Sequence, residues 1–306
     1  MGRARWHRKD FFLLAYIPAI TLIAWCLPER LWTVVCNAAA RLSMALHRSR
    51  AGYCQKLNEI LGERRTSLDV DEIIKCYLAK NHLARVQGMR CYAPGGWSPP
   101  MRLEGQEHIE RAQAAGKGAI LWIAPMASKD LITKMALHQA GYPVSHLSRF
   151  DHGFSISLWG ARLFNPLWTR IEERFLAERL VMSPSVQVSP LRWLIKRLRE
   201  NRLVSVTANR EGRKYPLKLP FLSGAIQLAE GAPTLAMTTG TALLPVFTVR
   251  EPDGTYITKV EPALHPATKG NTAMEVESLT KQYVQLLEFY ALRYPCAYQG
   301  WGLSGV

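Results

Sequence analysis

The chain contains one stretch that decides its fold: Gly118-Ala-Ile-Leu-Trp-Ile-Ala-Pro-Met-Ala-Ser-Lys-Asp-Leu131. Its apolar run from Ala119 to Ala124 carries no charge and lies between a glycine and a proline, which is typical of a buried parallel strand. A short polar turn follows and ends at Asp130. Because open α/β sheets place their sites at the carboxyl ends of strands, this turn is a candidate catalytic loop.

The segments around this stretch alternate between helix and strand patterns. After Asp130 a helix is predicted through Leu137 and Ala140, ending at Gly141-Tyr-Pro143, and a strand follows from Val144 to Leu147. The other predicted elements are a helix from about Gln106, a helix over Pro190–Glu200, strands over Leu203–Thr207, Leu243–Val249 and Tyr256–Val260, and a last helix over Met274–Tyr294. The β-α-β order predicts a single-domain α/β sandwich over residues 51–306, with a mixed, mostly parallel sheet.

The N-terminus is basic and then apolar. Four basic residues among the first ten precede an uncharged run from Phe11 to Leu27, which is at the lower limit for crossing a bilayer. No small-residue cleavage site follows, so we expect this hydrophobic helix to stay attached. Since basic residues flank it on both sides, a re-entrant or interfacial helix pair fits as well as a single span, and a buried core helix is the third alternative.

An amphipathic helix is predicted next, from Trp32 to Leu46. We therefore divide the chain into a membrane anchor with an interfacial helix over residues 1–50 and the α/β domain that follows.

The charge of the chain restricts its partners. A net charge of +15 and a pI near 9.8 call for an anionic partner: nucleic acid, an anionic membrane surface or an acidic substrate. No DNA- or RNA-binding motif is visible and the anchor accounts for much of the charge, so no nucleic acid partner is expected. The 6 cysteines form no CxxC pair and no zinc-ligand spacing. We expect them to be reduced thiols in a chain that faces the cytosol.

Polar loops follow the predicted strands at one edge of the sheet. They are the turn that ends at Asp130, the segment His146-Leu-Ser-Arg-Phe-Asp-His152 and the segment Ala208-Asn-Arg-Glu-Gly212. The apolar run Leu217-Lys-Leu-Pro-Phe-Leu-Ser-Gly-Ala225 follows them in sequence and is suited to wall a hydrophobic groove. Basic residues beside such a groove suit an amphiphile with an anionic head.

The order of these motifs resembles a known family. An anchor, an interfacial helix, an apolar strand with a polar-x4-acid turn, an arginine-bearing loop, Pro220-Phe-Leu-Ser-Gly224 and Ala236-Met-Thr-Thr-Gly-Thr-Ala-Leu-Leu-Pro-Val-Phe247 occur in the same order in the bacterial lipid A late acyltransferases, the lauroyl and myristoyl transferases. These are allied to the glycerolipid acyltransferases. The resemblance covers about Phe11 to Trp301.

The resemblance implies acyl transfer at the cytoplasmic face of a bacterial inner membrane. The acyl group would come from a thioester of acyl carrier protein or coenzyme A. It would go to a lipid, sugar or metabolite acceptor, without a metal, a cofactor or a covalent intermediate.

The residues of the family's HxxxxD/E motif carry over only in part. In that motif the histidine is the general base on the acceptor hydroxyl, and the acid orients the imidazole. Asp130 matches the acid and Arg149 matches a basic position after the second strand, but Pro125 falls on the histidine. Asn209 falls where relatives usually carry an aspartate, and Ser223-Gly224 only approximates a Phe-Phe-Gly block.

Proline cannot take a proton, so the family mechanism cannot run unchanged. One alternative is a surrogate base, His146 or His152, with Asp130 or Asp151 as its orienting carboxylate. A second is an acceptor that arrives as a neutral amine. A third is a catalytically inactive relative that binds lipid or acyl carrier protein as a partner subunit.

The other candidate residues also have two interpretations. Asp130 would serve well as a helix N-cap, and this role can coincide with a catalytic one. We interpret Arg149 and Arg210 as anion contacts rather than simple surface charges. Phe221 is an acyl-chain contact or an ordinary core residue, and Trp301 matches a family tryptophan or packs in the core.

Overall fold

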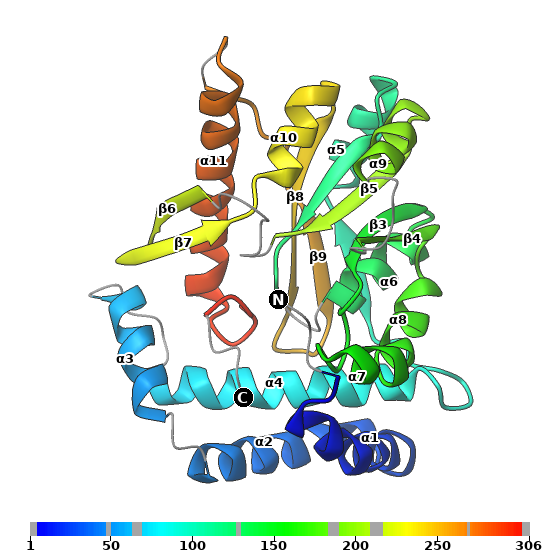
Figure 1. Cartoon of the computed structure of the whole chain (residues 1–306), viewed down its shortest axis with the longest axis vertical. Helices are drawn as coiled ribbons and strands as arrows, with labels where there is room; N and C mark the ends of the chain where they lie inside the picture. The colour runs from blue at the N-terminus through cyan, green and yellow to red at the C-terminus, as the bar shows by residue number, and fades with distance from the viewer. Residues whose placement is uncertain are drawn as a thin grey trace.

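The computed structural model describes residues 5–46, 50–62, 69–126, 130–182, 190–208, 217–267 and 270–301 (Figure 1). A 7-stranded sheet forms its centre, with the strand order β1-β9-β8-β2-β5-β3-β4. The strands are β1 (Met101–Glu104), β2 (Ala119–Ile123), β3 (Val144–Arg149), β4 (Glu178–Met182), β5 (Leu203–Thr207), β8 (Ala242–Arg250) and β9 (Tyr256–Val260). Neighbouring strands are parallel except for the antiparallel pair β8 and β9. The predicted α/β fold with a mixed, mostly parallel sheet is confirmed.

The central strand β2 is buried on both faces. Ala119, Leu121 and Ile123 belong to one hydrophobic cluster, and Ile120 and Trp122 belong to the other. This alternation explains why the sequence of the strand is apolar throughout. The predicted β-α-β unit from β2 to β3 exists, but β5 lies between these two strands.

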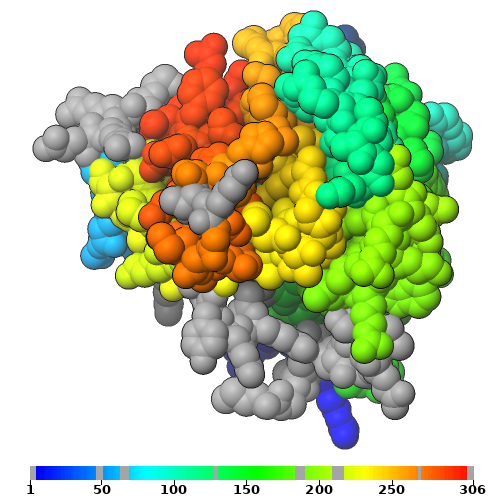
Figure 2. Space-filling model, turned by 90° about the horizontal axis from the view of Figure 1, so that it is seen from above, coloured from blue at the N-terminus to red at the C-terminus, as the bar shows by residue number. Residues whose placement is uncertain are grey.

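Helices cover both faces of the sheet. The cluster around Leu121 includes Ile109 of α5 (Gln106–Ala114) and Leu137 of α6 (Leu131–Gln139). The opposite cluster includes side chains of α9 (Pro190–Arg199), α10 (Gly231–Thr239) and α11 (Thr272–Arg293), and there the Trp122 ring stacks on the Tyr283 ring with centroids 3.9 Å apart. Seen from above, the orange-to-red surface of α11 and the yellow surface of α10 lie side by side (Figure 2). The molecule is thus a helix-sheet-helix sandwich.

The first helices pack at one end of this sandwich. They are α1 (Arg8–Cys26), α2 (Glu29–Leu46), α3 (Arg50–Leu61) and α4 (Val70–Arg90), and α1 and α2 lie beneath α4 in Figure 1. A capping box of Asp69 and Glu72 begins α4. Within the described residues, α1 is the one helix long and apolar enough to cross a membrane. It buries Leu13, Ile17 and Ile20 and exposes large apolar side chains on its other face.

The apolar run that starts at Leu217 forms a separate hairpin. Its strands are β6 (Leu217–Phe221) and β7 (Gly224–Leu228), which pair antiparallel. The hairpin packs against α3 and α11, away from α6 and β3 (Figure 1).

The expectation that all cysteines are reduced is wrong for two of them. Cys76 of α4 and Cys296, just after α11, form a disulfide across 220 residues of sequence. Their spacing carries no signal because only the tertiary fold brings the end of the chain against α4. Cys26, Cys36, Cys54 and Cys91 are not disulfide-bonded.

Candidate functional site

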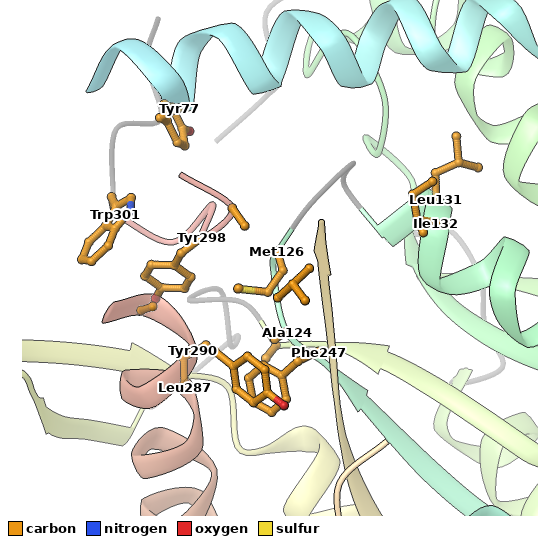
Figure 3. Close-up of a cluster of buried hydrophobic side chains, with 14 of the residues drawn as sticks. Tyr77, Ala124, Met126, Leu131, Ile132, Phe247, Leu287, Tyr290, Tyr298 and Trp301 are labelled. Carbon is orange, nitrogen blue, oxygen red and sulfur yellow. The ribbon is translucent and has the colours of Figure 1, made fainter. Parts of the chain in front are cut away.

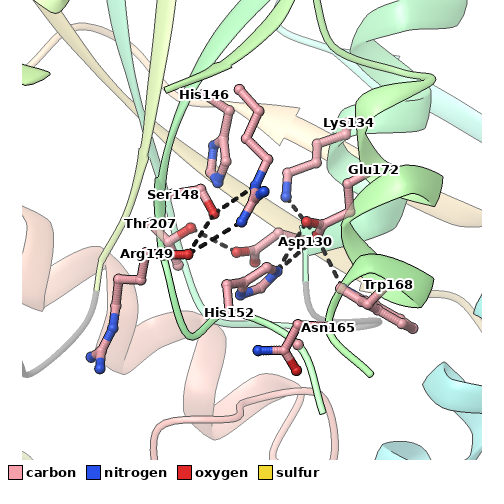
Figure 4. Close-up of polar contacts among 12 residues, drawn as sticks. Asp130, Lys134, His146, Ser148, Arg149, His152, Asn165, Trp168, Glu172 and Thr207 are labelled. Carbon is pink, nitrogen blue, oxygen red and sulfur yellow. Dashed lines mark hydrogen bonds and ion pairs between the residues drawn. The ribbon is translucent and has the colours of Figure 1, made fainter. Parts of the chain in front are cut away.

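A buried polar cluster lies between the sheet and the helices α6 and α8 (Pro166–Glu173), at the carboxyl ends of β3 and β5 (Figure 4). Glu172 is at its centre and is 0% exposed. Its carboxylate accepts hydrogen bonds from Lys134 Nζ at 2.7 Å and from Trp168 Nε1 at 3.1 Å. His152 Nε2 lies 3.1 and 2.9 Å from its two oxygens. Three donors from three segments therefore meet at Oε1, whereas the buried Oε2 has only the ion-pair contact with His152.

Local structure places these partners. Helix α8 begins with a proline at its first position, a place where proline suits a helix because its missing N–H is not needed. Trp168 and Glu172 are one turn apart in α8, so both side chains point to the same side. Lys134 is on the buried side of α6 and reaches Glu172 across the gap between the two helices.

The electrostatics keep Glu172 ionised. Burial by itself would raise the pKa of this carboxyl group, but the charges of His152 and Lys134 hold the pKa well below its ordinary value. The Glu172 carboxylate is therefore available to orient and stabilise a cation next to it.

The Glu172 carboxylate holds the imidazole ring of His152, which is partly exposed to solvent. Its side chain is 30% exposed, whereas Glu172 is fully enclosed. Its Nδ1 atom has no hydrogen-bond partner among the residues that the structure describes. When the ring carries its proton on Nε2 alone, Nε2–H donates to Glu172 and Nδ1 presents a lone pair. An imidazole held in this way is equipped to act as a general base.

Asp130 lies in the same cluster but does not cap α6. It has a left-handed backbone (φ 68) at the N-cap position and makes no side-chain capping hydrogen bond. Its carboxyl oxygen instead accepts from Thr207 Oγ1 at 2.7 Å. Burial raises the pKa of Asp130, against the opposing influence of Lys134 and of the Thr207 hydrogen bond. The carboxylate that holds His152 is Glu172, and neither Asp130 nor Asp151 takes that place.

His146 is sealed inside the cluster. It is 3% exposed, and its Nδ1 lies 2.8 Å from Ser205 Oγ of β5. Burial, helped by the charge of Lys134, lowers the pKa of His146 well below its ordinary value. The ring is therefore neutral and enclosed, so of the two candidate histidines only His152 faces solvent.

The lowered pKa of His146 predicts a specific acid sensitivity. The unfolded ring takes up a proton near pH 6.5 while the folded ring does not, so its contribution to stability is full above that pH and is lost as the pH falls. Between about pH 6.5 and pH 5.5 the free energy of unfolding of the wild type should therefore fall more steeply than that of His146→Gln, by up to about 1.4 kcal/mol per pH unit. Urea denaturation in detergent at each pH measures the difference. Parallel pH curves for the two proteins would contradict the burial of a neutral His146.

The other predicted site residues lie apart from this cluster. Arg149 extends away from it in Figure 4 and forms an ion pair with Asp151, with Nε 2.9 Å from Oδ1. Phe221 and Gly224 belong to the β6–β7 hairpin, where the Phe221 ring packs on Tyr298 with centroids 5.7 Å apart. Asn209 and Arg210 lie outside the described residues. The structure thus brings together Asp130, His146 and His152 and does not bring the hairpin to them.

Comparison with known proteins places the chain in a family. The model of the bacterial lipid A biosynthesis acyltransferases matches residues 5–298. The chain belongs to this family. Among solved structures, it is similar to the crystal structure of the 1-acyl-sn-glycerophosphate (LPA) acyltransferase PlsC from Thermotoga maritima, with 14% identity, 94% of this chain and 98% of that chain covered, and a TM-score of 0.38. No curated protein sequence matches the chain.

Pro125, which the resemblance aligns with the histidine of the acyltransferase motif, lies under the C-terminal segment. Its carbonyl oxygen accepts from the Gln299 amide at 2.7 Å. Tyr298 and Trp301, on either side of Gln299 in sequence, are buried with their ring centroids 4.9 Å apart, and Tyr298 lies between Trp301 and Met126 in Figure 3. Trp301 Nε1 donates to the Pro295 carbonyl at 2.8 Å, so the tryptophan packs within the segment itself.

Sequence reasoning missed the residues at the centre of the polar cluster. Lys134 and Glu172 were not among the candidates, although Glu172 follows Trp168 at helical spacing and so shares a buried face. This helical spacing was the one sequence pattern that could have indicated a buried Glu172. The part of the chain that the structure describes contains no group of three or more histidine, cysteine, aspartate or glutamate side chains able to hold a metal ion.

Proposed function

We propose that this family member is a membrane-associated acyltransferase in which His152, oriented by Glu172, replaces the motif histidine as general base. The observation that supports this most directly is the His152–Glu172 pair, with Nε2 2.9 Å from one carboxylate oxygen, on a partly exposed ring. A histidine with a buried carboxylate partner and a second nitrogen without a partner among the described residues has the geometry of the base in known acyl-transfer sites.

The proposed chemistry is a single displacement. His152 Nδ1 takes the proton of the acceptor hydroxyl while the oxygen attacks the thioester carbonyl carbon. The tetrahedral intermediate collapses, the C–S bond breaks, and the imidazolium returns its proton to the departing thiolate. Glu172 stabilises the imidazolium that forms between these steps. Asp130, which interacts electrostatically with His152, adds to that stabilisation when it is ionised.

The donor we propose is a fatty acyl thioester of acyl carrier protein or coenzyme A, and the acceptor is a lipid, sugar or metabolite. Residues 1–50 would dock on the membrane and residues 51–306 would carry the chemistry. The net charge of +15 and the exposed apolar side chains of α1 support contact with an anionic membrane. Arg149, Asn209 and Arg210 remain candidate contacts for anionic groups, and Phe221 and Gly224 remain candidate acyl-chain contacts.

We also propose that the protein acts at the cytoplasmic face of a bacterial inner membrane. The use of a carrier thioester as donor supports this location. The bond between Cys76 and Cys296 argues for the other side, because disulfides persist mainly in oxidising compartments.

Release of free thiol tests the activity. With an acyl carrier thioester and a bacterial lipid extract, the purified protein should release thiol at a rate that depends on the lipid acceptor. Asp130→Asn should lower that rate about tenfold, which corresponds to roughly 1.4 kcal/mol of transition-state stabilisation. Asp253→Asn, at an exposed turn, is the matched control. Acceptor-independent release, or an Asp130→Asn rate equal to the control, would contradict the proposal.

The second candidate is a non-catalytic relative that binds lipid or acyl carrier protein as a partner subunit. The proline at the motif histidine position favours it. Pro125→His keeps the backbone carbonyl that Gln299 contacts, so the substitution should preserve the local fold. If the wild type releases no thiol with any acceptor while Pro125→His does, the binding role is correct for the natural chain. Turnover by the wild type excludes it.

A further inference from the structure

The loop that follows His152 is held by contacts from distant parts of the chain. Arg85 of α4 donates from Nη2 to the Gly153 carbonyl at 2.7 Å, and its guanidinium lies 4.2 Å from the centroid of the Phe154 ring. The Asn165 side chain accepts from the amides of Phe154 and Ser155 at 2.7 and 2.8 Å. These contacts fix the backbone immediately after the proposed base.

A glycine makes this packing possible. Gly153 has φ 140, and a Cβ atom there would come within 2.7 Å of the Asn165 side chain. An L side chain at this position would therefore be strained and would also collide. The conformation of the loop therefore requires a glycine directly after His152.

The loop is also tied to the first turn of α1. Asp10, which is 1% exposed, accepts hydrogen bonds from the hydroxyls of Ser155 and Ser157 and from the His7 amide, the last two at 2.7 and 2.6 Å. A Cβ atom on Gly160 would lie 2.4 Å from the Asp10 carboxylate, so only glycine allows this approach. A buried charge from the start of the chain thus anchors a loop near its middle.

The two segments that Asp10 joins both expose large apolar side chains. On α1, Phe11 and Phe12 are 64% and 63% exposed, and in the second segment Ile156 is 69% exposed, with Trp159 and Leu163 also exposed. The Trp159 amide donates to the Arg5 carbonyl at 3.1 Å, so the segments are in contact. Arg8, Lys9 and Arg162 are exposed on the same two segments, and Arg5 is exposed just before α1. Apolar and aromatic side chains among cations match an anionic lipid bilayer.

We propose that Asp10 is a positioning residue that couples the docking of α1 and residues 156–163 on an anionic lipid bilayer to the placement of His152. Seating the joined apolar segments in the lipid holds Ser155 and Ser157 in place, and the fixed loop then holds the imidazole against Glu172. The inference rests on the proposed function, because it assigns Asp10 an effect on the proposed base.

Hydrogen exchange of the loop amides tests the coupling without any turnover. On vesicles of phosphatidylethanolamine and phosphatidylglycerol, amides of residues 154–160 of the wild type should exchange about tenfold more slowly than in neutral detergent. In Asp10→Asn, which keeps the shape but loses the charged acceptor, those amides should exchange about tenfold faster than in the wild type on the same vesicles. Asp69→Asn is the control, because asparagine caps α4 as well as aspartate does.

Kinetics separates positioning from general loss of structure. Asp10→Asn should lower kcat at least tenfold while leaving KM for the thioester unchanged, because the loop is not among the proposed donor contacts. If Asp10→Asn does not fold, Ser157→Ala removes one of the same hydrogen bonds and should show a smaller change in the same direction. Exchange in Asp10→Asn equal to that in Asp69→Asn, or wild-type exchange indifferent to vesicles, would overturn the coupling. Vesicle-dependent exchange without any thiol release would instead leave the coupling standing and refute the proposed function.

Discussion

His152→Gln is expected to lower the rate of acyl transfer by about 10²- to 10⁴-fold, the range that a general base contributes. Glutamine can still donate a hydrogen bond to Glu172, so the fold around the carboxylate should persist. It has no basic nitrogen to take the proton of an acceptor hydroxyl. Thiol release in the presence of lipid acceptor measures the loss, and the urea midpoint of the variant shows whether it is folded.

Two comparisons make this result specific for a base. His265→Gln changes an exposed histidine whose backbone carbonyl, rather than its side chain, makes the local hydrogen bond, so it should keep the wild-type rate. Added imidazole should restore part of the activity of His152→Gln, because a free base can enter the space that the smaller side chain leaves. A His152→Gln variant with full activity would show that the proton goes elsewhere.

The local patterns of the chain were sufficient for much of the fold. The strands Leu203–Thr207 and Tyr256–Val260 were predicted with the bounds that β5 and β9 have, because each is a short β-branched run between turn residues. Strand β4 (Glu178–Met182) was missed, since an edge strand with two charged residues lacks that pattern. The place of β5 between β2 and β3 was also missed, because strand order depends on contacts that no local window contains.

The site residues also divide into those that local sequence patterns indicate and those that depend on tertiary contacts. The strand-end rule brought His152 and Asp130 into consideration because both follow parallel strands. Lys134 and Glu172 were missed because each sits within a helix, where a charged residue ordinarily faces water. Their burial depends on tertiary structure, which brings α6 and α8 together at the Lys134–Glu172 ion pair, and the disulfide between Cys76 and Cys296 depends in the same way on tertiary contacts.

The second large effect concerns stability. Glu172→Gln removes the charge that balances Lys134, whose side chain is 1% exposed with Nζ 2.7 Å from the carboxylate. An uncompensated charge in a buried site costs about 3–5 kcal/mol, a large share of the stability of an ordinary domain. We therefore expect Glu172→Gln to shift the urea midpoint strongly downward at neutral pH.

A paired substitution separates the charge from the shape of the site. Lys134→Met with Glu172→Gln removes both charges while keeping side chains of similar size, so the double variant should recover most of the stability lost by Glu172→Gln. Such recovery would mean that the buried pair adds little net stability, and that its retention serves the orientation of His152. If the double variant is instead as unstable as the sum of the single variants, the cost comes from packing, and the electrostatic account of the Lys134–Glu172 pair is wrong.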